Sequence, residues 1–281
     1  METSVIDLFL AALVLAQTLP GVPVDLSWGR DPIWDDGKAE VARYDAHRKV
    51  YGADRAFETR IITVKEDFNK TLGVKADPPY EGKDLLTVLK MNVISRIDTE
   101  NYPYQYMTSL FVRREDPREV FKMTQSSQEW CGATFKEIVT WDGAPYMNYH
   151  SYFDGQGDGR TPITLGAGTY LEEQLLLVLR AAEMKEGVEY RFGLHAPLIT
   201  NSVRGHEVRE AVAKLSGEES LVTPAGTFTA RRIEIAAPGS SAAPMTFWIE
   251  KGGRRALLKL STADGRSLQL REISRRDYWS R

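Results

Sequence analysis

The sequence has only one cysteine, no excess of positive charge and no hydrophobic run long enough to cross a membrane. Cys131 alone cannot form a disulfide within the chain. The formal net charge of −3 at pH 7 lacks the basic excess that nucleic-acid binding requires, so no nucleic-acid partner is expected. The apolar run Leu8–Leu15 is far shorter than the about 20 residues that span a bilayer.

The same apolar run is typical of a secretory signal peptide. Val14 and Ala16 stand at the −3 and −1 positions for cleavage after Ala16, so residues 1–16 are predicted to be removed on export to the periplasm. Glu2 and Asp7 are unusual in a signal peptide, which leaves an ordinary first helix or a mis-assigned start as alternatives. No cysteine follows the run, so a lipid anchor is not expected.

The rest of the chain reads as mainly β. Hydrophobic residues make up 42% of the sequence, which is enough for a substantial core. After an irregular lead-in at residues 17–37, apolar and polar residues alternate with the period of a half-buried strand. The alternating apolar sets are Ala42, Tyr44 and Ala46; Tyr104, Tyr106, Leu110 and Val112; Phe121 and Met123; and Phe135, Val139 and Trp141. We expect one antiparallel β domain over residues 38–281.

The segment Ser220–Ile273 is the clearest part of this pattern. Gly252-Gly253 and Asp264-Gly265 separate three short strands, and both pairs suit two-residue hairpin turns that need positive φ angles. Upstream, the turn Thr223–Thr227 contains a proline followed by a glycine. The sequence therefore predicts a β-meander here.

One segment is predicted to be helical. Thr169 and Glu172 match a capping box, Gly187 matches a C-cap, and apolar residues recur at helical spacing between them. The predicted helix over residues 170–186 is apolar almost all round, so it must be buried. We expect a curved antiparallel sheet, a half-barrel or barrel-like sheet, that encloses this one helix.

Several segments between Leu175 and Ile273 resemble an uncharacterised bacterial periplasmic family. They are LRAAEMKEG, GEESLVTPAGTFTARRIEI, FWIEKGGRRALLKL and DGRSLQLREI; the earlier WDDGKAEVARYDA and SYFDGQGDG extend the resemblance to most of the chain. Members carry a TPAGTF turn, a tryptophan on the next strand and a closing hairpin. The resemblance implies an antiparallel half-barrel around a helix, similar to the lipoprotein-carrier proteins of the bacterial envelope, which hold acyl chains in a concave apolar face. It assigns no contact residue.

The residues expected to contact such a ligand come from the tyrosine-rich strands and from the apolar helix. Tyrosine supplies an apolar body with a polar tip, which suits the wall of an amphipathic pocket. The predicted ligand-binding residues are Tyr104, Tyr106, Tyr149, Leu175 and Leu179. The C-terminal arginines Arg271, Arg275, Arg276 and Arg281, with Trp279, suggest a peripheral contact with anionic lipid.

Other chemistry has little support in the sequence. Asp154 and Asp158 lie in a glycine-rich stretch that begins like a calcium loop, but Leu165 stands where the bidentate glutamate belongs, so a mobile loop is the simpler interpretation. No nucleophile elbow, phosphate loop or dinucleotide motif is present, and no base stands near Cys131 in the sequence, so no cofactor and no enzyme are expected.

The preferred hypothesis is an exported, non-enzymatic protein that binds an apolar or lipid-like ligand in the concave face of its sheet. Two alternatives stay open. One is an envelope scaffold that binds another protein through a sheet edge and holds no ligand. The other is a hydrolase built on His150 with Asp154 or Asp158.

Overall fold

The alternation of apolar and polar residues produces sixteen strands in the computed structural model, which describes residues 19–166, 168–204 and 207–279. They are β1 (Ala39–Val50), β2 (Ala53–Asn69), β3 (Val74–Lys75), β4 (Leu85–Ile97), β5 (Tyr104–Arg113), β6 (Asp116–Glu129), β7 (Gly132–Val139), β8 (Tyr146–Ser151), β9 (Asp158–Pro162), β10 (Thr169–Tyr170), β11 (Glu189–His195), β12 (Val208–Thr223), β13 (Gly226–Ala236), β14 (Met245–Glu250), β15 (Leu257–Ser261) and β16 (Ser267–Arg276). The predicted signal peptide lies outside the described residues.

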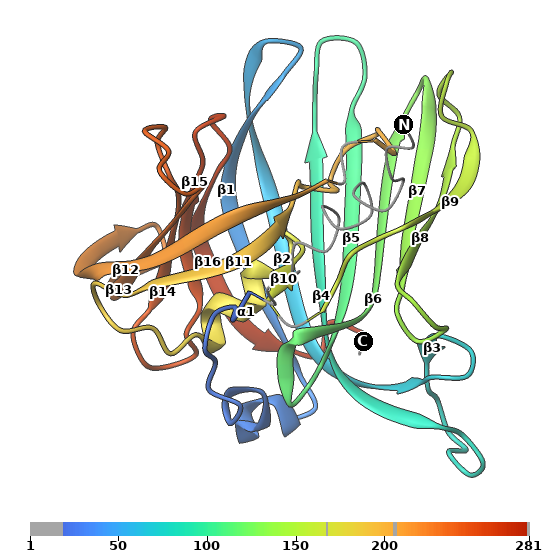
Figure 1. Ribbon diagram of the computed structural model, residues 1–281, viewed down its shortest axis with the longest axis horizontal. Helices are drawn as coiled ribbons and strands as arrows, with labels where there is room; N and C mark the ends of the chain where they lie inside the picture. The colour runs from blue at the N-terminus through green and yellow to red at the C-terminus, as the bar shows by residue number, and fades with distance from the viewer. Residues whose placement is uncertain (1–18, 167, 205–206, 280–281) are drawn as a thin grey trace, which may run out of the picture.

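All the strands belong to one large curved sheet that is open (Figure 1). Its order is β10-β11-β12-β13-β14-β15-β16-β1-β2-β4-β5-β6-β7-β8-β9, and β3 pairs with β2. Neighbouring strands are antiparallel, apart from the short parallel pair β10–β11. The predicted mainly β, antiparallel fold class is confirmed. The pairing of β1 with β16 joins the two ends of the chain at the centre of the sheet.

The C-terminal meander is confirmed as β12–β16, but its turns are longer than predicted. Gly252, Gly253 and Gly265 adopt positive φ angles of 77°, 52° and 84°. However, β14 ends at Glu250 and β15 begins only at Leu257. The Gly-Gly pair therefore lies within a longer loop, in which Arg255 also adopts a positive φ of 52°.

The helix is much shorter than the predicted span 170–186. Helix α1 is Leu175–Ala181, and Thr169–Tyr170 form strand β10 instead of a helix start. The reason lies in tertiary hydrogen bonds: Asp25 N donates to Ala181 O at 2.8 Å, and Glu183 N donates to Pro23 O at 2.8 Å. These bonds to the lead-in replace the helical ones, and Ala182 becomes extended.

Helix α1 is nevertheless buried, as its apolar character predicts. Leu175, Leu177, Val178 and Leu179 are at most 1% exposed, and they join the main hydrophobic cluster. That cluster also contains side chains from β4–β8 and from β11–β16, and we call the sheet face that contributes them the inner face. None of the described helices is both long and apolar enough to cross a membrane.

The lead-in packs its aromatic residues onto the core. It contains two short 3-10 helices, η1 (Trp28–Arg30) and η2 (Pro32–Asp35). The rings of Trp28 and Trp34 meet edge to face, with their centroids 5.5 Å apart, and both are buried. The lead-in is therefore irregular in backbone but fixed to the sheet.

The strand β7 reverses the face that the sequence suggests. Phe135 is 40% exposed, whereas its neighbours Thr134, Lys136 and Ile138 are buried on the inner face. The prediction that Phe135 shares the apolar face is thus wrong. The reason is local: Lys136 and Thr134 hydrogen-bond to residues 198–201 across the inner face, so the polar side chains point inward.

Candidate functional site

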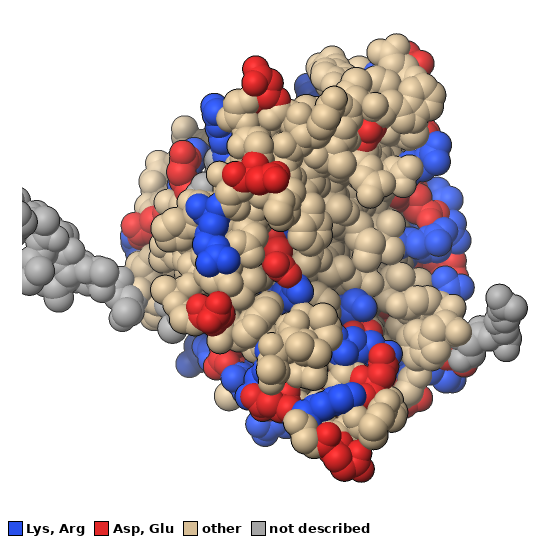
Figure 2. All heavy atoms as spheres, turned by 90° about the vertical axis from the view of Figure 1, so that its right-hand side faces the viewer, with Lys and Arg blue, Asp and Glu red and all other residues tan. Residues whose placement is uncertain are grey.

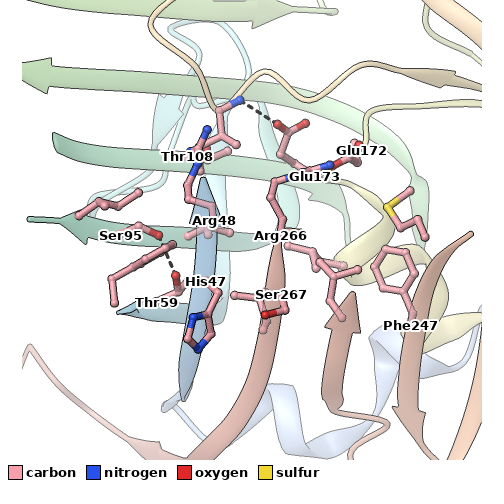
Figure 3. Close-up of a pocket in the computed structure, with 18 residues that line it drawn as sticks. His47, Arg48, Thr59, Ser95, Thr108, Glu172, Glu173, Phe247, Arg266 and Ser267 are labelled. Carbon is pink, nitrogen blue, oxygen red and sulfur yellow. Dashed lines mark hydrogen bonds and ion pairs between the residues drawn. The ribbon is translucent and has the colours of Figure 1, made fainter. Parts of the chain in front are cut away.

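A cavity of about 110 Å³ lies on the inner face, where the two halves of the sheet approach each other. Its walls come from β1, β2, β4 and β5 on one side and from β14–β16 on the other, with Glu172, Glu173, Leu176 and Ile199 contributing between them. Figure 3 shows the side chains that line it: His47, Arg48, Phe57, Thr59, Val93, Ser95, Ile97, Thr108, Glu172, Glu173, Leu176, Ile199, Met245, Phe247, Leu260, Arg266, Ser267 and Leu268.

Most of the cavity wall is apolar. Val93, Ile97 and Phe247 are buried, and Leu176 from α1 is half-buried against them. On the surface, Figure 2 shows a hollowed region that is largely uncharged, with charged residues gathered around it. The apolar wall of the cavity favours an apolar ligand over an ionic one.

Two arginines line the cavity, and they differ in whether their charge is paired with a carboxylate. Arg266 is held by Glu172, with Nη1 2.5 Å from Oε1, and by Asp264, with Nε 2.8 Å from Oδ2. Arg48 lies with its guanidinium carbon 5.3 Å from the centroid of the Tyr106 ring, and its Nε is buried without a hydrogen-bond partner among the described residues. Arg266 is therefore neutralised locally, whereas Arg48 keeps a donor unused.

A buried pair of opposite charges lies beside the cavity. Glu173 is 8% exposed, and its Oε1 accepts hydrogen bonds from Leu198 N at 2.6 Å and from Ile199 N at 3.1 Å (Figure 3). Lys136 is 2% exposed, and its Nζ donates to Leu198 O at 2.7 Å and to Thr200 Oγ1 at 3.2 Å. Both side chains thus hold the same short segment.

Burial shifts the pKa values of both Glu173 and Lys136 in the direction that favours the uncharged form. It raises the pKa of Glu173 to about 7, with the nearby carboxylate of Glu172 adding to the rise. It lowers the pKa of Lys136 to about 8, against the attraction of Glu173. Near neutral pH the carboxyl group of Glu173 is therefore partly protonated.

The segment held by this pair, residues 196–204, we call the strap. It directly follows β11 in the chain. Two further hydrogen bonds hold it to the sheet: Asn201 O accepts from Thr134 Oγ1 at 2.8 Å, and Asn201 Nδ2 donates to Glu129 Oε1 at 2.9 Å. Ile199 of the strap lines the cavity. The strap thus forms part of the cavity wall and is fixed by polar side chains of the inner face.

None of the five predicted ligand-binding residues lines the cavity. Tyr104 and Tyr106 are 3% and 7% exposed and form a small cluster with Ile97, which does line the cavity. Leu175 and Leu179 are fully buried in the main cluster, and Tyr149 packs against its edge. Leu176, between them in the sequence, is the α1 residue that lines the cavity.

The residues considered for other chemistry lie on exposed parts of the sheet. His150 Nδ1 is 3.4 Å from Asp158 Oδ1, with side chains 65% and 74% exposed. The nearest serine in that cross-strand row, Ser126, is two strands away from His150, roughly 10 Å at about 4.8 Å per strand, and a nucleophile needs hydrogen-bond contact with its base.

Among the described residues, no group of three His, Cys, Asp or Glu side chains that could hold a metal ion is found. Cys131 is exposed in the turn between β6 and β7, with its Sγ 3.1 Å from the Tyr102 hydroxyl. In the C-terminal tail, Arg271 pairs with Asp45 and Arg275 pairs with Asp36. Arg281 lies outside the described residues.

The polar residues of the inner face were missed by the sequence reasoning. Thr108 occupies the position between Tyr106 and Leu110 in the alternating set, so the period of two alone places it inward. Gln125 follows Met123 in the same way. A polar residue at a position that the alternation assigns to the apolar face therefore marks a buried polar group. Glu173 has no such mark in the sequence, because it lies in the segment that is predicted to be helical.

Comparison with known proteins gives no further assignment: no family model, no curated protein and no solved structure matches this chain.

Proposed function

We propose that this chain is an exported, non-enzymatic binding protein that holds an apolar or lipid-like ligand on the concave inner face of its sheet. The observation that carries the proposal is the apolar cavity between the two halves of the sheet, beside Leu176 of α1. Ligand sites of binding proteins are concave and mostly apolar, with a few polar groups that orient the ligand. The resemblance to an envelope family whose implied fold is similar to that of lipoprotein-carrier proteins favours the same class of ligand.

The size of the cavity restricts the shape of the ligand. At about 110 Å³ it is smaller than the roughly 150 Å³ apolar cavities that admit benzene. It is also well below the roughly 300–1,000 Å³ of pockets for drug-sized molecules. A thin, unbranched alkyl chain suits this space better than a ring system, and the remainder of such a ligand would lie outside the cavity.

The proposal is tested with the purified full-length chain. Mass spectrometry under native conditions should detect a co-purifying amphiphile, and calorimetry should detect the binding of a long-chain alcohol such as decanol. Failure of every alkyl compound to bind would refute the proposal. Capture of an envelope protein without any bound amphiphile would favour the scaffold alternative.

A cavity-filling variant locates the binding. Leu176→Phe adds a ring at the half-buried lining residue of α1 and should weaken decanol binding by about tenfold, since overpacking costs on the order of 1–3 kcal/mol. The matched control is Val222→Phe, because Val222 is 69% exposed and is absent from the lining. Equal affinities in the two variants would place the ligand elsewhere.

A further inference from the structure

The inner face is polar where β5, β6 and β7 meet. Thr108 pairs with Gln125 across β5 and β6, and Gln125 pairs with Lys136 across β6 and β7. All three side chains are at most 2% exposed. Ser127, two residues after Gln125 on the same face, is 3% exposed. A continuous polar row is therefore buried in a sheet face whose next row, Leu110, Met123 and Ile138, is apolar.

Most of this row lacks hydrogen-bond partners within the described part of the chain. The unpaired buried atoms are Thr108 Oγ1, Gln125 Oε1, Gln125 Nε2, Ser127 Oγ and Glu173 Oε2, and the Nε of Arg48 is unpaired as well. A buried polar atom without a partner costs about 1–3 kcal/mol, so several in one place are a large local penalty. Groups of this kind are normally satisfied by water or by a ligand.

Three of these unpaired groups border the apolar cavity. Thr108, Glu173 and Arg48 line it, Gln125 continues the row directly beside Thr108, and Ser127 lies outside the lining. Figure 3 shows Thr108 and Arg48 on the side of the cavity away from Phe247. Thr59 and Ser95, which also line it, hydrogen-bond to each other, so the unpaired polar atoms are concentrated at one part of the wall, which we call the polar end and which matches a molecule with one polar head.

The charges at the polar end decide the charge of that head. Lys136 interacts electrostatically with Glu173, and Arg48 and Glu129 both lie close enough to act on Tyr106; Glu129 also holds the strap through Asn201. Arg266 is balanced by Glu172 and Asp264. Lys136 already donates to Leu198 O and Thr200 Oγ1, and Arg48 is only half-buried. An anionic head would lie against the carboxyl group of Glu173, whose Oε2 is buried and unpaired, and a cationic head would lie beside Arg48 and Lys136, so the site disfavours a charged head of either sign.

We propose that the polar end recognises a neutral head that both donates and accepts hydrogen bonds, such as the hydroxyl or primary amide of an alkyl alcohol or alkyl amide. This inference rests on the proposed function, because it names the head of the ligand whose chain lies against the apolar wall. The Gln125 amide offers an NH2 group that donates and a carbonyl oxygen that accepts, and the hydroxyl of Thr108 can do either. The head pairs with those of these atoms that it reaches and removes their penalty.

The experiment compares ligands that share one alkyl chain and differ only in the head. Decanol, decanamide, methyl decyl ether and decanoate are titrated into the full-length protein by calorimetry. Decanol and decanamide should bind roughly tenfold more tightly than the ether, which cannot donate, since one hydrogen bond is worth about a factor of ten. Decanoate should bind more weakly than decanol.

Two conservative variants test the residues, and a third is the control. Thr108→Val and Gln125→Met should each reduce the affinity for decanol by about tenfold, reduce the affinity for methyl decyl ether less because the ether can only accept, and raise the melting temperature of the free protein by removing unpaired atoms. Thr63→Val is matched, because Thr63 is buried with an unpaired Oγ1 on β2 but does not line the cavity. It should raise the melting temperature without any change in affinity.

The outcomes separate the two proposals. If none of the four ligands binds the unmodified protein, the proposed function fails and the head preference fails with it. If the ligands bind but decanoate binds most tightly, or if Thr108→Val affects decanol no more than Thr63→Val does, the neutral head is refuted while the apolar binding function stands.

Discussion

Buried charge is handled in two different ways at the residue scale. Arg180 and Glu40 are each 4% exposed in their side chains and form a two-point pair, with Nη1–Oε1 at 2.7 Å and Nη2–Oε2 at 3.1 Å. Arg180 also donates to the carbonyls of Arg254 and Arg255, both at 3.0 Å. These contacts fix α1 to β1 and to the β14–β15 loop. Removal of either Arg180 or Glu40 would leave the other as an uncompensated buried charge.

Glu173 is the opposite case, because one of its oxygens is unpaired and its pKa is raised by burial to about 7 from 4.5. Between about pH 4.5 and 7 the unfolded chain releases this proton while the folded chain keeps it. The unfolded state then binds fewer protons, so stability falls as the pH rises through this window. The difference corresponds to about 3 kcal/mol.

We therefore predict that Glu173→Gln removes a decline in the free energy of unfolding between about pH 4.5 and 7. Urea denaturation across this range, for the variant and the unmodified protein, measures the difference in slope. Glu81→Gln is the control, because Glu81 is exposed and the slope should stay the same. A Glu173→Gln slope equal to that of the unmodified protein would contradict the prediction.

Lys136 acts in the opposite direction at higher pH. Burial lowers its pKa to about 8 from 10.5, so between these values the folded state has lost a proton that the unfolded state keeps. Stability from this group rises with pH in that window. The two groups together contribute least to stability between about pH 7 and 8, where both are charged.

At the scale of elements, the strands could be predicted and the helix boundaries could not. The alternation at Ala42, Tyr44 and Ala46 depends only on the period of the strand, and all three are buried in β1 as expected. The end of α1 at Ala181 depends on hydrogen bonds to Pro23 and Asp25, more than 150 positions earlier in the chain. Propensity and capping motifs do not contain that information.

The site was predictable only in part for the same reason. The apolar character of α1 predicted a buried element, and a lining residue, Leu176, belongs to it. Phe247 of β14 and Val93 of β4 line the same cavity, although their strands are far apart in the sheet order. Their approach depends on how the whole sheet curves. Sequence periodicity assigns residues to faces but does not say which distant faces meet.

Helix α1 offers a prediction from two adjacent residues. Leu177→Ala should destabilise the protein by about 2–5 kcal/mol, because Leu177 is 1% exposed in the main cluster. Leu176→Ala should cost less than half as much, because Leu176 is half-buried and already borders a cavity. Urea denaturation of both variants measures the difference, and equal costs would show that α1 does not present these two faces as described.

At the scale of the molecule, the sheet is held together at its centre by the two ends of the chain. β1 pairs with β16 over Ala39–His47, and the pairing carries an ion pair between Arg43 and Glu272 at 3.0 Å. On one side of this pair lie β2–β9 and on the other lie β10–β15. The two halves contact each other through this pairing and through the core around α1. The main hydrophobic cluster contains residues of both halves, so the halves share one large core.

This arrangement predicts that both halves unfold together. Leu270, on β16, is fully buried in the main cluster, and Leu270→Ala should destabilise the protein by about 2–5 kcal/mol. Because β16 lies between the halves, hydrogen exchange measured by mass spectrometry in low urea should show the same loss of protection in peptides from β5–β7 and from β12–β13.

The control variant is Leu72→Ala, at a residue that is 68% exposed, and it should leave protection in both halves unchanged. If Leu270→Ala exposed only β12–β15 and spared β5–β7, the two halves would be independent folding units. The cavity between them would then open whenever one half unfolds, and ligand binding would protect only that half. Equal loss in both halves instead means that a ligand in the cavity stabilises the entire sheet, since it binds only the state in which both walls are formed.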